Sequence, residues 1–357
     1  MRLGIIGLPN CGKTTIFNAL TGSSLETGAV SGGRFEVHTA VVNVPDPRVD
    51  RLSALYKPRK TTYAQVTYVD IAGLDKGVSE GGLKGQFRNE LAQVDGYLHV
   101  VRAFADEAVP HPYEAVDPAR DLDILDAEFL LTDLITVENR LNKLQAELRV
   151  KGRGVDPAVP AEVELMEMFK AQLEAERPLR DLDLTPDQRK AVRGYGFLTL
   201  KPALIVLNTG ENQPDIALDY DHAHTRVVAL QGKIEAEIAQ LDPDDAALFM
   251  AEYGIAERSA ARVIRLSYEL LAIQSFFTVG EDEVRAWSIP VGATAPEAAG
   301  VIHSDLQKGF IRAEVMKCDD LLAAGSEAAL KAAGKFRLEG KEYVVKDGDI
   351  VHIRFNV

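Results

Sequence analysis

Lys13 and Thr14 close a pattern whose residue types and spacing specify a chemistry. Gly7, four further residues, Gly12, Lys13 and Thr14 together form G-x-x-x-x-G-K-[ST]. An apolar run before this pattern predicts a strand, and residues 15–20 predict the start of a helix, which is the context that a phosphate-binding loop requires. The glycines let the backbone curl until several N–H groups face one anion, and the helix N-terminus adds its positive end. The stretch therefore predicts a nucleoside triphosphate site.

Each side chain of the loop has an expected role. Lys13 is expected to reach the terminal phosphates, and the Thr14 hydroxyl is expected to ligate Mg²⁺. The backbone of the loop is expected to hold the phosphates with its N–H groups. The predicted phosphate-binding residues of the loop are therefore Asn10, Cys11, Gly12, Lys13, Thr14 and Thr15.

A second motif supplies the partner that a phosphate loop needs. Residues 65–69 predict a strand that ends on Asp70, and Gly73 completes D-x-x-G. The Asp70 carboxylate is expected to hold Mg²⁺, directly or through water, and the Gly73 N–H to reach the γ-phosphate. Leu74 stands where Ras-type proteins carry the glutamine that orients the attacking water. We therefore predict catalytic roles for Lys13, Asp70 and Gly73, together with slow intrinsic hydrolysis.

The base pocket is predicted at the end of another buried strand, residues 202–207. Asn208, Thr209 and Glu211 occupy the corner that reads N-K-x-D in guanine-specific proteins. Glu211 shifts the carboxylate by about one methylene relative to that Asp, and paired hydrogen bonds tolerate little misplacement. Guanine preference is expected to be weakened or lost.

Composition restricts the classes of function that remain. The chain has 357 residues, which predicts two or three domains, and its net charge of −14 argues against broad attachment to nucleic acid or anionic membranes. Two cysteines, Cys11 and Cys318, cannot form a disulfide framework, which fits a reducing compartment. The first residues already form the predicted strand and loop, so we expect no signal peptide, and no apolar run is long enough to span a membrane. A cytoplasmic protein is predicted.

Two further regions follow. Apolar residues spaced by four and three predict a helix with a heptad seam. A second apolar stripe at residues 163–173 predicts a helix that returns beside it, so that the two form an antiparallel hairpin. The hairpin would serve as a structural spur or as a partner-binding arm. The seam residues are Leu130, Leu134, Val137, Leu141, Leu144 and Leu148.

The region that leads from the last strand of the P-loop domain to the C-terminal part is predicted to be helical to about Phe277. Beyond Gly280 we expect a ubiquitin-like α+β binding module with strands at 286–289, 312–315, 342–345 and 350–355 and helices at 296–302 and 320–332.

The fold class predicted is thus α/β. It comprises a P-loop nucleotide-binding domain (residues 1–118 and 197–278), an inserted coiled-coil hairpin (119–196) and a C-terminal α+β domain (279–357).

In this order, the motifs make the whole chain resemble the Obg-like ATPases of the YchF/OLA1 type. The segments that carry the resemblance are GLPNCGKTTIFNALTG, VPDPRVDRL, VDIAGLDKG, RDLDILDAEFLLTDLITVENRL, NTGE, IEAEIAQL and VKDGDIVHIRFNV. The resemblance implies a TGS-type C-terminal domain, ATP preferred over GTP through the N-x-x-E corner, and association with ribosomes and stress responses. RNA is a further candidate partner, and Mg²⁺ is the expected cofactor.

The chain also departs from that family. Family members carry a threonine that faces Mg²⁺ ahead of V-P-D-P-R, and counting back from Pro45 places this position on Arg34. Asn10 matches the loop asparagine that K⁺-dependent relatives use, so K⁺ is a second candidate cofactor. The main hypothesis is a slowly hydrolysing ATPase switch, in which the γ-phosphate orders residues 31–38 and 74–86. A translational GTPase and a nucleotide-gated binding module without hydrolysis remain as alternatives.

Overall fold

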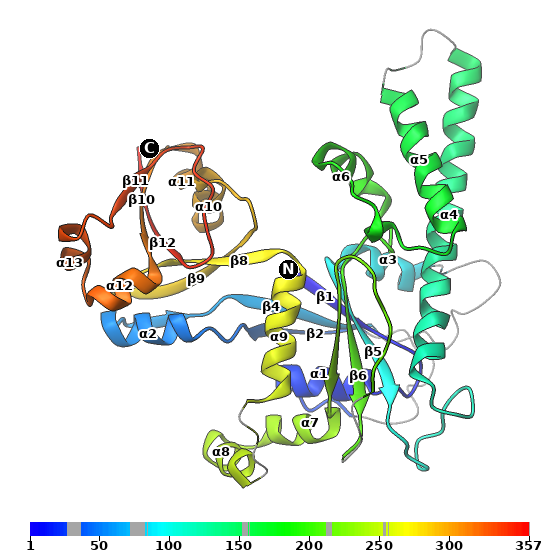
Figure 1. The fold of residues 1–357 in the computed structure, drawn as a ribbon, viewed down its shortest axis with the longest axis horizontal. Helices are drawn as coiled ribbons and strands as arrows, with labels where there is room; N and C mark the ends of the chain where they lie inside the picture. The colour runs from blue at the N-terminus through cyan, green and yellow to red at the C-terminus, as the bar shows by residue number, and fades with distance from the viewer. Residues whose placement is uncertain are drawn as a thin grey trace. The chain divides into compact units, whose positions relative to one another are not determined.

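Two compact units make up the chain in the computed structural model (Figure 1). The first unit holds Met1–Ala40 and Thr67–Val263, and the second holds Val41–Val66 and Ile264–Val357. The structure describes residues 1–26, 37–71, 83, 85–151, 156, 158–211, 216–252, 255 and 257–356.

A six-stranded sheet in the order β2-β4-β1-β5-β6-β7 organises the first unit. The neighbours β4, β1, β5, β6 and β7 pair in parallel. Every residue of β5 is buried, as expected for a parallel strand covered on both faces. The strands are β1 (Arg2–Ile6), β2 (Val37–Asn43), β4 (Gln65–Ile71), β5 (Gly96–Ala103), β6 (Ala203–Thr209) and β7 (Thr225–Leu230).

Helices follow most of these strands. The capping box of α6 shows how local sequence fixes a start, because the Thr185 hydroxyl accepts from the Gln188 N–H while the Gln188 side chain accepts from the Thr185 N–H. The helices are α1 (Lys13–Thr21), α3 (Gly85–Gln93), α4 (Pro118–Lys151), α5 (Ala158–Glu174), α6 (Pro186–Val192), α7 (Gly232–Gln240), α8 (Pro243–Glu252) and α9 (Ser259–Leu270), with short 3-10 turns η3 (Leu179–Asp181) and η4 (Arg193–Tyr195).

The predicted hairpin is present as α4 and α5, which lie side by side in Figure 1. Val137, Leu141 and Leu144 of the heptad seam are buried against Met166 and Phe169 of the returning helix. The remaining seam leucines pack against the same cluster and are partly buried. The spacing of apolar residues thus identified both helices and the faces on which they meet.

The second unit is built on its own six-stranded sheet, in the order β11-β10-β12-β8-β9-β3. Helices α10 and α11 pack on the core of this sheet, which includes Phe276, Phe310 and Val351. The strands are β3 (Lys60–Thr62), β8 (Ile273–Thr278), β9 (Glu283–Pro290), β10 (Phe310–Lys317), β11 (Arg337–Glu339) and β12 (Asp349–Phe355). The helices are α2 (Pro47–Tyr56), α10 (Ala295–Ile302), α11 (Ser304–Lys308), α12 (Cys318–Ala324) and α13 (Glu327–Ala332).

Residues 41–66 belong to this second unit, although the sequence analysis assigned them to the P-loop domain. β3 adds to the sheet in parallel with β9. Arg48 of α2 bonds Asp347 at 2.6 Å and lies over the ring of Phe277. The contacts of these residues explain the division, because an ion pair, a cation–π contact and a strand pairing all join them to the C-terminal elements.

Three predicted elements of the C-terminal part were wrong. Residues 273–278 form β8 rather than helix, because α9 ends at Leu270. The predicted helix 320–332 is two helices, because Gly325 adopts φ 74° and Ser326 caps a new start. Residues 342–345 contact residues 293–295 through backbone hydrogen bonds and one bridge, so the strand beside β10 is β11 instead.

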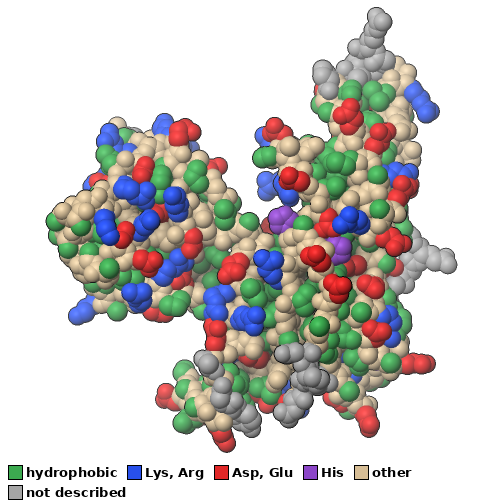
Figure 2. Space-filling view, viewed as in Figure 1, with side chains coloured by type: hydrophobic (Ala, Val, Ile, Leu, Met, Phe, Trp, Pro, Cys, Tyr) green, Lys and Arg blue, Asp and Glu red, His purple; other side chains and the backbone are tan. Residues whose placement is uncertain are grey.

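The net charge of the chain resides in the first unit. The second unit contains 16 Lys and Arg and 16 Asp and Glu, out of 40 and 54 in the whole chain, which leaves 24 and 38 for the first. Lys and Arg side chains gather on the visible face of the second unit (Figure 2). None of the described helices combines the length and the apolar composition needed to cross a bilayer.

Candidate functional site

The loop between β1 and α1 has the backbone that its glycines predict. Gly7 and Gly12 adopt φ 152° and 94°, which side-chain-bearing residues rarely adopt. A Cβ on Gly7 would overlap the Val100 carbonyl, and a Cβ on Gly12 would overlap the Asn208 amide. The loop therefore packs too closely against β5 and β6 for any other residue at these two positions.

Lys13, the first residue of α1, folds back over this loop. Its Nζ donates to the carbonyl oxygens of Gly7 at 3.0 Å and Leu8 at 2.9 Å. An ammonium group has three N–H donors, so these two bonds hold the amine at the loop with one donor to spare. The helix N-terminus beneath it carries partial positive charge. Both features favour an anion at this position.

Asp70 lies beside Thr14 because β1 and β4 are parallel neighbours, with Ile5 paired to Asp70. The Thr14 hydroxyl donates to Asp70 Oδ2 at 3.1 Å. Asp70 is only 1% exposed, and its Oδ1 is buried with no hydrogen-bond partner among the described residues. Burial raises the pKa of this carboxyl group, and Lys13 opposes the shift. A buried oxygen without a partner is costly, and a carboxylate beside a hydroxyl is the oxygen set that Mg²⁺ prefers.

Asn208 at the end of β6 braces the loop. Its Nδ2 donates to the Cys11 carbonyl at 3.0 Å, and its Oδ1 accepts from the Gly232 N–H at 3.1 Å. Both ends of the amide are therefore used within the protein, which ties the phosphate loop to the start of α7. Cys11 is buried, and burial raises the pKa of its thiol, so the thiol remains protonated at neutral pH.

Arg102 is a residue that the sequence analysis missed. It is 2% exposed at the end of β5 and donates to the carbonyl oxygens of Val109 at 2.8 Å and Asn10 at 3.4 Å. Asn10 has φ 60°, and its Nδ2 donates to the Pro110 carbonyl at 2.9 Å. The segment around residue 110 thus holds Asn10 from outside the loop. A charged residue at the end of an otherwise apolar strand was the available signal in the sequence.

A second connection missed from the sequence joins α3 to the hairpin stem α4. The Leu83 N–H donates to the Thr132 hydroxyl at 2.8 Å, and Arg88 donates to the Thr136 hydroxyl at 3.2 Å. These two threonines lie one turn apart on α4. The helix that follows the D-x-x-G motif is thereby bonded directly to the hairpin.

The structure brings most of the predicted site residues together. The loop residues 10–15, Asp70 and Asn208 converge at the carboxyl ends of β1, β4 and β6, the edge at which open α/β sheets bind ligands. Thr209 ends β6, and Glu211 is exposed two residues later. Gly73, Leu74 and Arg34 lie outside the described residues, so their predicted roles stay predictions.

Comparisons with known proteins support this picture. A family model described as "50S ribosome-binding GTPase" matches residues 2–140. The model YchF-GTPase_C, described as "Protein of unknown function", matches residues 273–356. The two matches fall on the parts of the chain that carry the phosphate loop and the C-terminal sheet.

Relatives match over essentially the full length. "Ribosome-binding ATPase YchF" of Pasteurella multocida (strain Pm70) is 43% identical, over all of this chain and 99% of the relative. "Obg-like ATPase 1" of Oryza sativa subsp. japonica is 39% identical, over all of this chain and 92% of the relative. A solved structure, "Structure of the Schizosaccharomyces pombe YchF GTPase", is 34% identical with a TM-score of 0.85, and covers 99% of this chain and 97% of that one.

Proposed function

The chain belongs to the YchF and Obg-like ATPase family, and from this membership we propose that it is a ribosome-binding ATPase that works as a nucleotide-driven conformational switch. The named relatives are ATPases, and the P-loop fold and the full-length match extend that activity to this chain. The ribosome is the proposed partner, RNA a further one, and the cytoplasm the proposed location.

One observation carries the proposal for the nucleotide site. Asp70 presents a buried carboxylate oxygen that has no partner in the described part of the chain, next to the Thr14 hydroxyl, with Lys13 held over the same loop. These residues fit Mg²⁺ bound to a nucleoside triphosphate, with Thr14 as ligand and Asp70 acting directly or through water. When bound, Mg²⁺ would neutralise charge on the β- and γ-phosphates. Lys13 and the N–H groups of residues 10–15 would orient the phosphates.

The adenine preference is proposed from the N-x-x-E corner. Each end of the Asn208 amide makes a bond that braces the loop, so we expect Asn208 to position the corner, and Glu211 and the Thr209 backbone are the candidates for contact with the base. GTP is expected to bind more weakly. Asn10 is the candidate K⁺ ligand, because its Nδ2 is engaged by Pro110 and its Oδ1 is the end that remains.

The output of the switch is proposed to pass through α3. Ordering of residues 74–86 by the γ-phosphate, as predicted from the sequence, would act on the hairpin stem, because Leu83 in that range and Arg88 of α3 bond Thr132 and Thr136 of the stem. The hairpin and the C-terminal domain would then present different surfaces to the partner in the two nucleotide states. The domain boundaries 119–196 and 279–357 and the TGS-type assignment remain part of this proposal. The proposed P-loop domain is 1–118 with 197–278, except for residues 41–66, which pack with the C-terminal elements.

Titration calorimetry tests the nucleotide assignment. We would compare ATP, GTP and non-hydrolysable analogues, with Mg²⁺, in K⁺ and then in Na⁺. ATP is expected to bind more tightly than GTP, and Asp70→Asn is expected to weaken the Mg²⁺-dependent part of ATP binding. Asp123→Asn, at an exposed carboxylate on α4, is the matched control. Tighter GTP binding would reject the adenine pocket and indicate a GTPase.

Two further assays distinguish the ATPase switch from a nucleotide-gated binding module without hydrolysis. Single-turnover measurements with K⁺ and ribosomes should release phosphate slowly, and no release at all would favour a binding module without hydrolysis. Sedimentation with ribosomes should depend on whether ATP, its analogue or ADP is present. Sedimentation that ignores the nucleotide would reject the switch while leaving the ATPase intact.

A further inference from the structure

Strand β12 continues past the end of its neighbour in the second unit. It pairs with β10 along its whole length, from Lys317↔Asp349 to Phe310↔Phe355. Its pairing with β8 is confined to Ile350↔Phe277, because β8 ends at Thr278. Alternate residues of an antiparallel strand direct their N–H and C=O groups away from the partner. From residue 351 onward, these groups of β12 face a side on which no described strand pairs with them.

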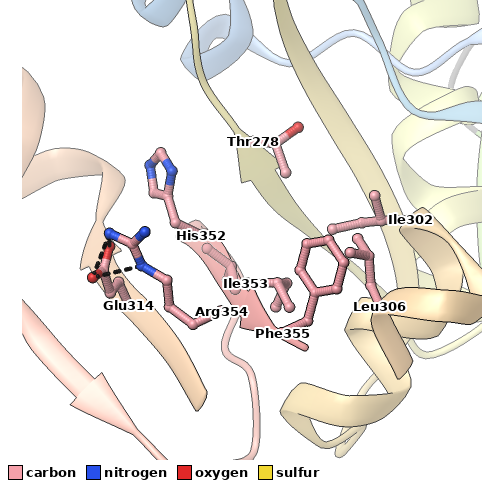
Figure 3. A pocket seen from close by; sticks show the side chains of 9 residues that line it. Thr278, Ile302, Leu306, Glu314, His352, Ile353, Arg354 and Phe355 are labelled. Atoms are coloured by element: carbon pink, nitrogen blue, oxygen red, sulfur yellow. Dashed lines mark hydrogen bonds and ion pairs between the residues drawn. The ribbon is translucent and has the colours of Figure 1, made fainter. Parts of the chain in front are cut away.

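A groove lies along this open side. It has a volume of about 320 Å³ and is lined by Thr278, Ile302, Leu306, Glu314, Val351, His352, Ile353, Arg354 and Phe355. Figure 3 shows Ile302 and Leu306 facing Ile353 and Phe355, so one wall of the groove is apolar. Phe355 is 43% exposed, which leaves part of this apolar wall open to solvent.

The other face of β12 at the groove is charged. Figure 3 shows His352 and Arg354 directed to the side opposite Ile353. Arg354 bonds Glu314 at 3.0 and 3.1 Å. Arg312 lies directly opposite Arg354 in the β10–β12 register, and like charges in such a pair are unfavourable. Two guanidinium groups thus occupy facing positions of the sheet, so a further carboxylate would be favourable here.

We propose that this groove binds an extended segment of a partner polypeptide, which adds to the open edge of β12 as a strand. The unpaired backbone groups require a partner with its own alternating N–H and C=O groups, which a polypeptide offers. An added strand directs alternate side chains to opposite faces. One row would enter the apolar wall at Ile302 and Leu306, and the other would lie beside Arg354. The segment recognised is therefore one in which apolar and acidic residues alternate.

The edge of β11 does not compete for this role. β11 has three residues, and none of them lines the groove. Short edge strands are a common protection against unwanted pairing. β12 combines a longer open edge with a ready apolar wall, which is why the occupant is assigned there.

The test uses the full-length protein and a labelled synthetic peptide in which valine and glutamate alternate. Fluorescence anisotropy measures binding, and Trp287, the single tryptophan of the chain, reports locally because its Nε1 donates to Thr278 Oγ1 at 2.9 Å at the groove. We expect saturable binding with a change in Trp287 emission. A peptide of the same composition with the valines and glutamates in two blocks, and one with proline at alternate positions, should bind at least about tenfold more weakly, because each loses the register or the backbone donors.

Protein variants locate the site. Phe355→Asp should abolish binding, whereas Val344→Asp, at a residue of similar exposure (44%) outside the groove, should leave it unchanged. Arg354→Glu should lose the valine–glutamate peptide and gain an alternating valine–lysine peptide, a reversal that a misfolded variant would not show. Equal binding of the block and alternating peptides, insensitivity to Phe355→Asp, or preference for a short oligouridylate would each overturn the proposal.

Discussion

Asp70 and Asp133 are two carboxylates of the first unit with nearly the same burial and opposite surroundings. Asp70 is 1% exposed and Asp133 is fully buried. Asp133 accepts from the N–H groups of Leu198 and Thr199 and from the Thr199 hydroxyl, at 2.7 to 2.9 Å. Asp70 accepts from Thr14 and has a buried oxygen without a partner among the described residues. Burial alone does not separate them, but hydrogen-bond satisfaction does.

The difference distinguishes a residue that maintains the fold from one that we propose holds a ligand. Asp133 fixes α4 to the chain that leads into β6, at the base of the hairpin. Nearby, Arg180 bonds Tyr220, and Tyr220 donates to Asp126 at 2.7 Å, although the buried Arg180 Nε has no partner among the described residues. Buried polar groups that are fully paired specify one arrangement. The Asp70 oxygen that lacks a partner among the described residues is stable only at a cost in free energy, which a bound cation would remove.

The largest expected effect comes from Asp133→Asn. The amide keeps one acceptor oxygen but places an N–H₂ group against N–H donors, so at least one buried donor loses its partner. We expect a loss of about 2–4 kcal/mol in the free energy of unfolding, measured by urea denaturation. Asp123→Asn, at an exposed position of the same helix, should change it by less than about 0.5 kcal/mol. Equal effects of the two substitutions would show that the hydrogen bonds of Asp133 add no particular stability to the fold.

Asp70→Asn should show the reverse profile. The free energy of unfolding should change by less than about 1 kcal/mol, because the amide oxygen still accepts from Thr14. ATP hydrolysis should fall by about 10²-fold, because the proposed Mg²⁺ partner is lost. Steady-state phosphate release and urea denaturation measure the two sides. A strongly destabilised Asp70→Asn protein would mean that Asp70 is structural after all.

The pH dependence of the free energy of unfolding tests the role of Asp133 separately. Burial raises its pKa to about 6 from 3.8, and this desolvation outweighs its three hydrogen bonds. The folded state therefore binds more protons than the unfolded state between about pH 4 and 6. The Asp133 contribution to the free energy of unfolding should fall as pH rises through this window, by about 2–3 kcal/mol.

The difference in unfolding free energy between wild type and Asp133→Asn isolates this contribution from other titrating groups. The difference should be largest near pH 4 and shrink toward pH 7. Asp123→Asn should parallel the wild type throughout. A difference that grows with rising pH would show that Asp133 is ionised more readily in the folded state than in the unfolded one.

The sequence predicted Asp70 but not Asp133, and the reason is physical. Asp70, Lys13 and Thr14 belong to motifs with a local strand–loop–helix geometry, so spacing alone was sufficient to propose their roles. Asp133 meets residues that lie 65 and 66 positions further along the chain, and nothing near it in sequence identifies that partner. Arg102 carried a local signal, but its bond to the Asn10 carbonyl joins residues 92 positions apart and could not be read from that signal.

The fold shows the same division between local and distant information. Heptad spacing identified α4 and α5, and motif order identified the sheet of the first unit. The place of residues 41–66 in the second unit was not foreseen, because it depends on Arg48 meeting Asp347, 299 residues away. Strand β8 was taken for helix because its apolar residues follow an amphipathic helix without a strong break signal.

The smallest expected effect comes from removing the hydrogen bond between the Leu83 N–H and the Thr132 hydroxyl, which lies next to Asp133 on α4. Thr132→Val keeps the shape of the side chain but removes the hydroxyl that accepts from the Leu83 N–H. We expect a loss of about 1 kcal/mol in the free energy of unfolding. If α3 transmits the nucleotide state to the hairpin, the ratio of ribosome affinities with the ATP analogue and with ADP should also fall, by about two- to fivefold.

Thr225→Val is the control, because it removes a buried hydroxyl that donates to the His222 carbonyl elsewhere in the same unit. This variant should lose a similar free energy of unfolding and keep the wild-type ratio of ribosome affinities. A reduced ratio in both variants would mean that any loss of stability uncouples the switch, and the hairpin stem would then have no special part in it.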